Sequence, residues 1–126
     1  MLAARALLAE RYRGALAGIE ELELPCHDEG GNTRSWFVFV VQLPPAADRD
    51  DTVRALAAAG IQSKPYLPAI HLMSFYRERF GHRAGEFPVC EDVAARSLAL
   101  PFFPAMSEGQ VASVAEGLGA ALGRPA

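Results

Sequence analysis

The apolar residues of this chain recur with two different periods, and each period predicts an element of structure. A first stripe has the spacing of one face of an amphipathic helix and consists of Leu8, Tyr12, Leu16 and Ile19. A second stripe predicts the last helix and consists of Val111, Val114, Leu118 and Leu122. Ser107 followed by Gln110 forms a capping-box pair, so we expect the last helix to begin there.

The segment 35–43 (SWFVFVVQL) is rich in aromatic and β-branched residues, which predicts a strand. Strict alternation assigns one face to Trp36, Val38 and Val40, and the other to Phe37, Phe39 and Val41. Both faces are therefore apolar. A sheet with helices on one side exposes its other face, which is then polar. The second apolar face therefore predicts either additional helices or a neighbour that is absent from this chain.

Turn and cap residues predict the remaining elements. They are a short strand at 22–24, a helix from Asp50 or Asp51 through Ala59, a strand at 61–66, a long connection at 67–88 with a helical turn near 74–80, a helix at 89–97 and a strand at 98–103. Pro101 restricts the last of these to a sheet edge or a strand end. This order predicts an α+β fold with a mainly antiparallel sheet of three to four strands and helices packed on one face.

Composition bounds the class of protein. The chain has 126 residues, 51% of them apolar, which suits one ordinary globular core. Its net charge of −3 gives it no electrostatic reason to bind nucleic acid or an anionic membrane. Charged residues interrupt the N-terminal apolar segment and exclude a secretory signal: Arg5, Glu10, Arg11 and Arg13. Cys26 and Cys90 have no zinc-ligand spacing, so we expect free thiols in a reducing cytoplasm and no metal.

The long connection differs in charge from the rest of the chain. From Lys64 to Arg83 the cations are Lys64, Arg77, Arg79 and Arg83, against the single acid Glu78. Tyr66, Tyr76 and His71 lie among them, and guanidinium groups beside aromatic rings suit a ligand with phosphates and a flat base. The alternative interpretation is that these cations form a basic helix face that is exposed to solvent and binds no ligand. His71 is either a ligand-binding or a hydrogen-bonded structural residue, whereas we expect His27 and His82 to be exposed.

Lys64 is the only lysine, so any Schiff base with a cofactor aldehyde would have to form there. It directly precedes Pro65 at a predicted strand end and has no nearby motif with an aspartate partner. The sequence also has no Gly-rich phosphate loop and no nucleophile elbow. We therefore expect no catalytic and no cofactor-binding residue in this chain.

Three segments together carry a resemblance to a known family. They are GIQSKPYLPAIH at 60–71, FYRERFG at 75–81 and FPVCEDVAARSLALPFF at 87–103. From Arg34 onward the chain resembles the C-terminal domain of the DegT/DnrJ/StrS family of pyridoxal-phosphate (PLP) sugar aminotransferases. ERYRGALAGIEEL at 10–22 is similar to the link between the two domains of those enzymes. The resemblance implies that residues 1–20 are a linking helix from an absent large domain and that 21–126 are the small domain.

The resemblance also implies a function. Family members are fold-type I homodimers in the cytoplasm that transfer an amino group, usually from glutamate, to a keto sugar on a nucleoside diphosphate. Their products feed polysaccharide, glycan and antibiotic-sugar biosynthesis. PLP is held by the large domain, whose motifs have no match here. The substrate-binding residues implied by the matching stretch are Tyr66, His71, Tyr76 and Arg77, with Lys64 as a further candidate.

Three interpretations follow from these observations. The chain is the C-terminal part of such an aminotransferase, inactive without its PLP domain. Alternatively, it is a free-standing nucleotide-sugar-binding or oligomerisation module without catalysis. A third interpretation, a self-contained enzyme that uses His71 with Lys64, requires a closed pocket around those two residues. An uncovered apolar face of the 35–43 strand, or of part of the first helix, would favour the first interpretation over the second.

Overall fold

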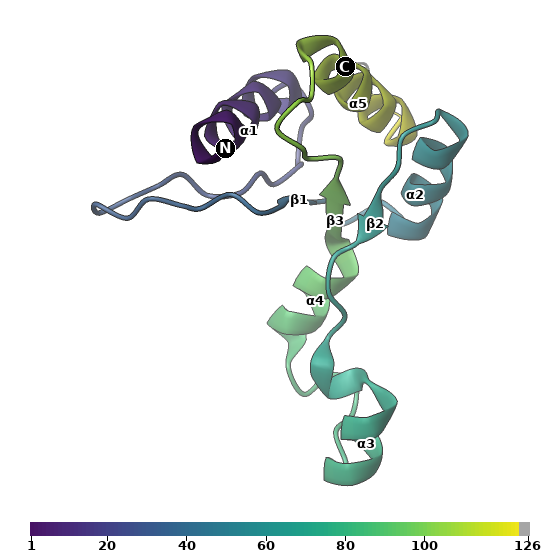
Figure 1. Cartoon of the computed structure of the whole chain (residues 1–126). Coiled ribbons are helices and arrows are strands. Elements are labelled where there is room, and N and C mark those ends of the chain that lie inside the picture. Colours follow the sequence, from purple (N-terminus) through teal and green to yellow (C-terminus); the bar gives the residue numbers. More distant parts are fainter. Residues whose placement is uncertain (124–126) are drawn as a thin grey trace.

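The computed structural model describes residues 1–123. These residues form a body from which a long arm extends (Figure 1). In chain order the elements are α1 (Leu2–Leu16), β1 (Phe39–Gln42), α2 (Arg49–Ala58), β2 (Lys64–Pro65), the 3₁₀ turn η1 (Ile70–Leu72), α3 (Ser74–Phe80), α4 (Pro88–Arg96), β3 (Ser97–Leu100) and α5 (Glu108–Ala121). We call residues 66–96 the arm and the remaining described residues the body. The α+β class and the small antiparallel sheet are confirmed.

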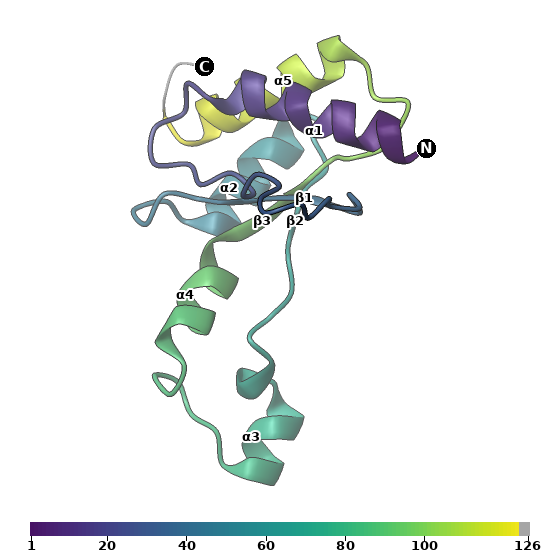
Figure 2. The same ribbon diagram turned by 90° about the vertical axis from the view of Figure 1, so that its left-hand side faces the viewer.

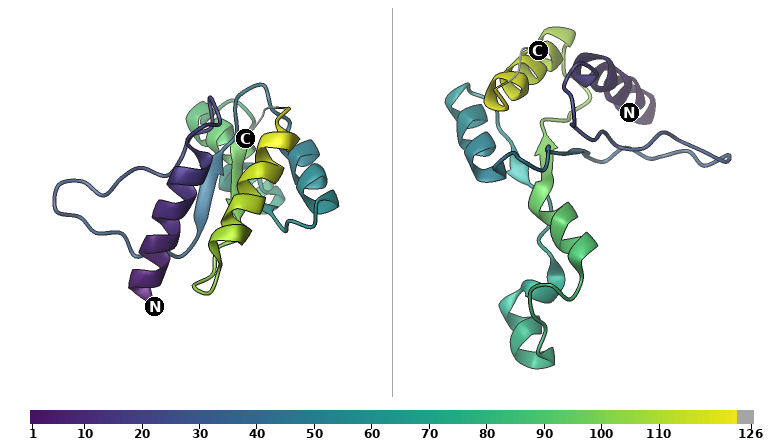
Figure 3. Two further views of the ribbon diagram at one scale, coloured as in Figure 1. Left: turned by 90° about the horizontal axis from the view of Figure 1, so that it is seen from above. Right: turned by 180° about the vertical axis from the view of Figure 1, so that it is seen from behind.

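The body has two layers. Helices α1, α5 and α2 lie side by side on one face of the sheet, with α5 in the middle (Figure 3). The arm, with α3 and α4, extends from the opposite side of the sheet (Figure 2). Residues 24–38 form a further extended loop that leaves the body sideways (Figure 1).

The sheet has three strands in the order β1-β3-β2, and both pairings are antiparallel. β3 is therefore the central strand, and the expectation of an edge strand at 98–103 was wrong. The alternative of a strand end was right, because β3 stops at Leu100, directly before Pro101. Ser97–Leu100 contains no proline, so each of its residues can donate to a neighbouring strand.

The strand expected at 35–43 is shorter than its composition indicated. It begins at Phe39, and the rings of Trp36 and Phe39 stack with centroids 5.7 Å apart, so these two side chains lie on the same side. Phe37 is 77% exposed. The assigned alternation fails before Phe39 because these residues have no partner strand. Instead, Nη1 of Arg5 donates to the Phe37 carbonyl at 2.9 Å.

Other boundaries also moved. The segment 22–24 forms one isolated bridge, between Glu23 and Gln42, and the strand expected at 61–66 contains only Lys64–Pro65. Helix α2 begins at Arg49, because Asp48 caps it by accepting the Asp51 amide at 2.8 Å. The last helix is confirmed with its complete capping box.

The core lies entirely in the body. Its buried apolar side chains are Leu8, Ala9, Tyr12, Leu16, Ile19, Phe39, Val41, Leu43, Leu56, Leu98, Leu100, Met106, Val111, Val114, Ala115 and Leu118. Tyr12 stacks on Phe39 with centroids 4.9 Å apart, and its hydroxyl donates to the Pro101 carbonyl at 2.6 Å. Burial raises the pKa of Tyr12 far above its ordinary value of 10.0, so the hydroxyl remains a donor. Within the described residues, no fully buried side chain of this core lies between Leu56 and Leu98, although the half-buried Ile61 packs against it.

Neighbouring leucines of α1 provide a matched test of this core. Leu8 is 2% exposed and Leu7 is 55% exposed. We expect Leu8→Ala to lower the free energy of unfolding by about 2–5 kcal/mol, because it removes buried methyl groups and leaves a cavity. Leu7→Ala should change it by less than about 0.5 kcal/mol. Urea unfolding of both variants measures the difference, and similar losses would mean that α1 does not pack as described.

Candidate functional site

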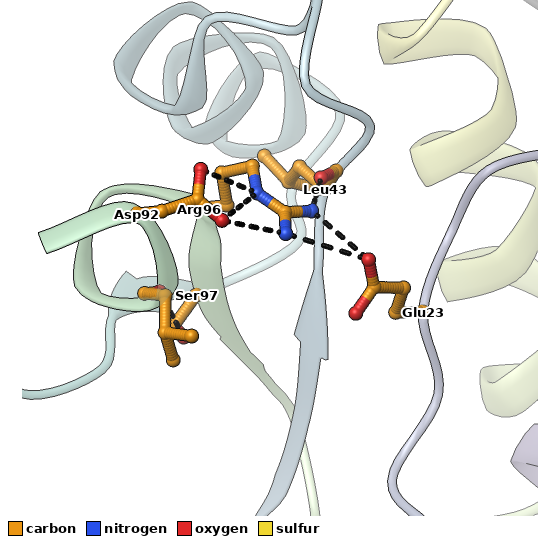
Figure 4. A network of polar contacts seen from close by, with 6 residues as sticks. Glu23, Leu43, Asp92, Arg96 and Ser97 are labelled. Carbon is orange, nitrogen blue, oxygen red and sulfur yellow. Dashed lines mark hydrogen bonds and ion pairs between the residues drawn. The ribbon is translucent and has the colours of Figure 1, made fainter. Parts of the chain in front are cut away.

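Arg96 joins the base of the arm to the body (Figure 4). Its Nη1 donates to the Leu43 carbonyl at 2.8 Å, and its Nη2 donates to Asp92 Oδ2 at 2.9 Å. Nη2 also lies 3.4 Å from Oε1 of Glu23. The hydrogen bond to Asp92 and the charges of Asp92 and Glu23 raise the pKa of Arg96. One guanidinium thus connects α4, the end of β1 and the bridge at Glu23.

A second arginine supports the same junction. Nη1 of Arg49, the first residue of α2, donates to the Ala94 carbonyl at 2.6 Å. A positive charge at the C-terminal end of α4 is favourable, because unsatisfied carbonyls give that end a partial negative charge. The Ser97 hydroxyl donates to the Val93 carbonyl at 2.6 Å (Figure 4). The last turn of α4 is therefore held by side chains from outside the helix.

Further along the arm, two histidines each meet a carboxylate. His71 is buried in η1, and its Nε2 lies 3.4 Å from Oε2 of Glu91. Nδ1 of His82 lies 2.8 Å from Oε2 of Glu86. The expectation that His82 is exposed was wrong, because its side chain is 33% exposed and paired. Phe87 lies against the His71 ring edge-on, with centroids 4.9 Å apart.

The carboxylate of Glu91 also binds backbone amides. It accepts from Gly85 at 2.9 and 3.0 Å and from Phe87 at 3.2 Å. The Gly85 bond, the Phe87 bond and His71 hold the pKa of Glu91 below its ordinary value of 4.5. Sequence reasoning missed Glu91. A local feature of the sequence could have identified it. Pro88 marks the start of α4, and Glu91 lies in the first turn, where a carboxylate can accept hydrogen bonds from free backbone amides.

Two adjoining apolar depressions lie along the arm. The larger has a volume of about 760 Å³, and its lining includes Tyr66, Phe87 and Val93. The second has about 670 Å³, and its lining includes His71 and Tyr76. Residues common to both are Leu67, Pro68, Phe87 and Cys90. The structure therefore brings Tyr66, His71 and Tyr76 to one continuous apolar surface.

Arg77 and Lys64 lie elsewhere. Arg77 is exposed on α3 and lines a separate depression of about 510 Å³ with Arg83 and Glu78. His82 lines both this depression and the one that contains His71. Lys64 is exposed on β2, paired with Ala99 of the central strand. His71 and Lys64 do not line a common depression in the described part of the chain.

The residues present do not fit PLP. The single lysine, Lys64, is exposed on a strand and lines none of the depressions described above. Cys26 and Cys90 are free thiols, and both are exposed, as is His27. Over residues 1–123, no three His, Cys, Asp or Glu side chains converge as a metal site. No helix in that range is long and apolar enough to cross a bilayer.

Comparison with known proteins gives a consistent result. A model of the DegT/DnrJ/EryC1/StrS aminotransferase family matches residues 1–119. The spore coat polysaccharide biosynthesis protein SpsC from Bacillus subtilis (strain 168) is 29% identical over 114 residues, which are 86% of this chain and 29% of SpsC.

Two solved structures show the same fold. The aminotransferase TlmJ from Streptoalloteichus hindustanus has a TM-score of 0.82 and 28% identity, over 97% of this chain and 32% of TlmJ. DesV from S. venezuelae, solved with a ketimine intermediate, has a TM-score of 0.80 and 27% identity, over 98% of this chain and 32% of DesV. The chain thus spans about a third of the length of these relatives.

The Arg96 junction predicts a loss of stability in Arg96→Gln. The shorter amide cannot reach all three partners, so the Leu43 carbonyl and Asp92 lose charge-assisted hydrogen bonds. We expect the free energy of unfolding to fall by about 2 kcal/mol. Among residues 1–123, Arg54 pairs with Asp51 alone, on the exposed face of α2, so Arg54→Gln should cost less than about 0.5 kcal/mol. Equal costs in urea unfolding would contradict the described role of Arg96.

The Glu91 contacts predict a pH dependence of local opening. Because the folded pKa of Glu91 is lowered, its stabilisation is complete above the ordinary value of 4.5 and is lost as the pH falls through the folded pKa. Amide protection factors of Gly85 and Phe87 should therefore fall several-fold between pH 5 and 3, corrected for intrinsic exchange. The Ala47 amide, which donates to the Pro44 carbonyl, is the control. If all three amides lose protection together, global unfolding is the cause and the prediction is wrong.

Proposed function

Because the chain belongs to the DegT/DnrJ/EryC1/StrS aminotransferase family, we propose that it is the C-terminal part of a PLP-dependent enzyme that aminates nucleotide-linked keto sugars. The family match over residues 1–119 is the observation that carries this proposal. The name of SpsC, a polysaccharide biosynthesis protein, supports a role in polysaccharide or other glycan assembly. The ketimine bound to DesV supports PLP chemistry for the complete enzyme.

In this proposal the reaction requires a PLP-binding domain that supplies the cofactor lysine. Lys64, the single lysine here, is exposed on β2 and cannot replace it. Residues 1–20 would be the linking helix and 21–126 the small domain. Helix α1 packs against α5 and contributes Leu8 and Tyr12 to the core, which makes the link an integral part of the body.

The apolar surface of the arm supports a missing neighbour. The arm has no share in the core, yet its exposed large apolar side chains are Leu67, Ile70, Met73, Phe75, Phe80, Phe87, Val89 and Val93. Contiguous apolar surfaces of this kind mark sites of association. We assign the large PLP-binding domain as the partner that covers this surface, within a homodimeric cytoplasmic enzyme.

The same arm is our candidate for contact with the nucleotide sugar. Tyr66 and Tyr76 offer aromatic faces to a base, and on the apolar surface His71 lines the same depression as Tyr76. Arg77 and Lys64 can reach phosphate oxygens only from outside this surface. The aromatic residues are therefore the first candidates for base recognition, and the exposed cations would act after closure against the large domain.

A free-standing module is the second candidate function. The body favours it, since it buries a complete core from α1, the sheet, α2 and α5 without help from another chain. In that case the chain would bind a nucleotide sugar or a second copy without catalysis. The two candidates differ in whether the arm needs a PLP-binding partner.

Reconstitution separates these candidates. The chain is produced alone and together with a PLP-binding domain of the family, such as the corresponding part of TlmJ. We expect PLP absorbance and glutamate-dependent amination of a nucleotide keto sugar only in the mixture, with at least about 100-fold less activity for the chain alone. Amination by the isolated chain would contradict the proposal.

Matched variants locate the contact. Val89 is 77% exposed on the arm, and Leu7 is 55% exposed on α1. Val89→Ser should lower the amination activity of the reconstituted mixture about tenfold, because it removes apolar surface from the contact with the large domain. Leu7→Ser should leave it within twofold. Activity that is insensitive to Val89→Ser would place the contact with the large domain elsewhere on the chain.

A further inference from the structure

Glu91 brings three segments of the arm together through one carboxylate. It lies in the first turn of α4, accepts the amides of Gly85 and Phe87, and faces His71 of η1. Nε2 of His71 is buried and makes no hydrogen bond of normal geometry within the described residues. The Glu91 carboxylate at 3.4 Å is therefore its polar contact. His71 is one of the candidate substrate-binding residues from the sequence, whereas Glu91 is not.

The loop that carries His71 has little else to determine its conformation. Residues 66–69 belong to no helix or strand, and Leu67 has a φ of 52°. A left-handed backbone at a leucine is strained and persists only where surrounding contacts impose it. One end of the loop is held by the sheet, through the Tyr66 amide and the Ser97 carbonyl at 3.4 Å. The other end is held at His71.

The charged surroundings of this contact are few. His82 and its partner Glu86 lie on the side of His71 that carries Phe87, and the two histidine rings are 6.2 Å apart. Arg49 lines a depression together with Glu91 and with residues of the loop that carries His71, among them Pro68 and Leu72. Glu91 is the group that contacts both His71 and the loop at 85–87.

We propose that Glu91 is a positioning residue, which holds His71 and with it the loop 66–72 in the orientation that meets the nucleotide part of the substrate. This inference rests on the proposed function for the identity of the ligand. Glu91 itself does not line either of the two apolar depressions at which Tyr66 and His71 lie. It acts through His71, whose Nε2–H would donate to the carboxylate and so select one ring tautomer.

The test uses nitrogen chemical shifts of the histidine ring in the 126-residue chain, with Glu91→Gln and the matched variant Glu86→Gln. We expect the Nε2–H tautomer of His71 in the native chain and a mixture of tautomers in Glu91→Gln. Glu86→Gln removes the neighbouring carboxylate at His82 and should leave His71 unchanged. If Glu91→Gln leaves both the His71 tautomer and the amide shifts of 66–72 unchanged, the proposal is wrong.

Ligand binding is measured separately, with UDP and dTDP as probes and the amide shifts of 66–72 as the signal. Glu91→Gln should weaken binding at least about tenfold. The control is Glu10→Gln, which removes an exposed carboxylate on α1 of the body and should change binding less than twofold. Equal weakening by both variants would overturn the proposal. If the native chain binds neither nucleotide, the assignment of a nucleotide ligand is wrong. The tautomer measurement then still decides whether Glu91 positions His71.

A second variant separates positioning from a general loss of the arm. His71→Asn removes the contact from the other side while Glu91 keeps its bonds to Gly85 and Phe87. The amide shifts of 66–72 should then move, while the Gly85 and Phe87 amides stay protected. If Glu91→Gln unfolds the arm, His71→Asn carries the test alone. Unchanged loop shifts in that variant would overturn the proposal.

Discussion

The guanidinium of Arg96 lies where α4 runs into β3, the central strand of the sheet. It donates to the Leu43 carbonyl and pairs with Asp92 and Glu23. One side chain therefore links the end of β1 to the base of the arm. The Leu43 amide in turn donates to the Arg96 carbonyl at 2.9 Å. Because the arm has no share in the core, its direction relative to the body depends on this junction and on Arg49. The candidate ligand residues His71, Tyr76 and Arg77 lie on the arm beyond this junction, whereas Tyr66 is bonded to the sheet through the Ser97 carbonyl.

Body and arm are stabilised in different ways. The body buries a continuous apolar core between three helices and one face of the sheet, with the Tyr12 hydroxyl satisfied by the Pro101 carbonyl. The arm instead combines polar contacts, namely the two histidine–carboxylate pairs and the amides bound by Glu91, with ring contacts such as that of Phe87 with His71. Polar contacts of partly exposed groups contribute little individually. An arm built in this way should open locally at a lower free energy than the body.

The proposed division of labour follows from this difference. A small domain can fold around its own core and still present an apolar arm to a larger domain. The chain spans about a third of its relatives. Its aromatic residues share one surface of the arm, while Arg77 lines a neighbouring depression that shares His82. Such a surface can contribute to the recognition of a nucleotide sugar, but it contains no group suited to form a Schiff base.

The sequence by itself determined the elements whose signals are local: the stripe of α1, the capping box of α5, the start of α4 near Pro88 and the α+β class. It also placed Tyr66, His71 and Tyr76 in the basic stretch from Lys64 to Arg83, and these residues do lie along one surface. Only the tertiary structure decided that β3 is central, that Trp36 packs beside Phe39, and that Glu91 and Arg96 organise the arm. The reason is physical. Periodicity and caps act within a few residues, whereas pairing order and the partners of a buried charge depend on residues distant in sequence.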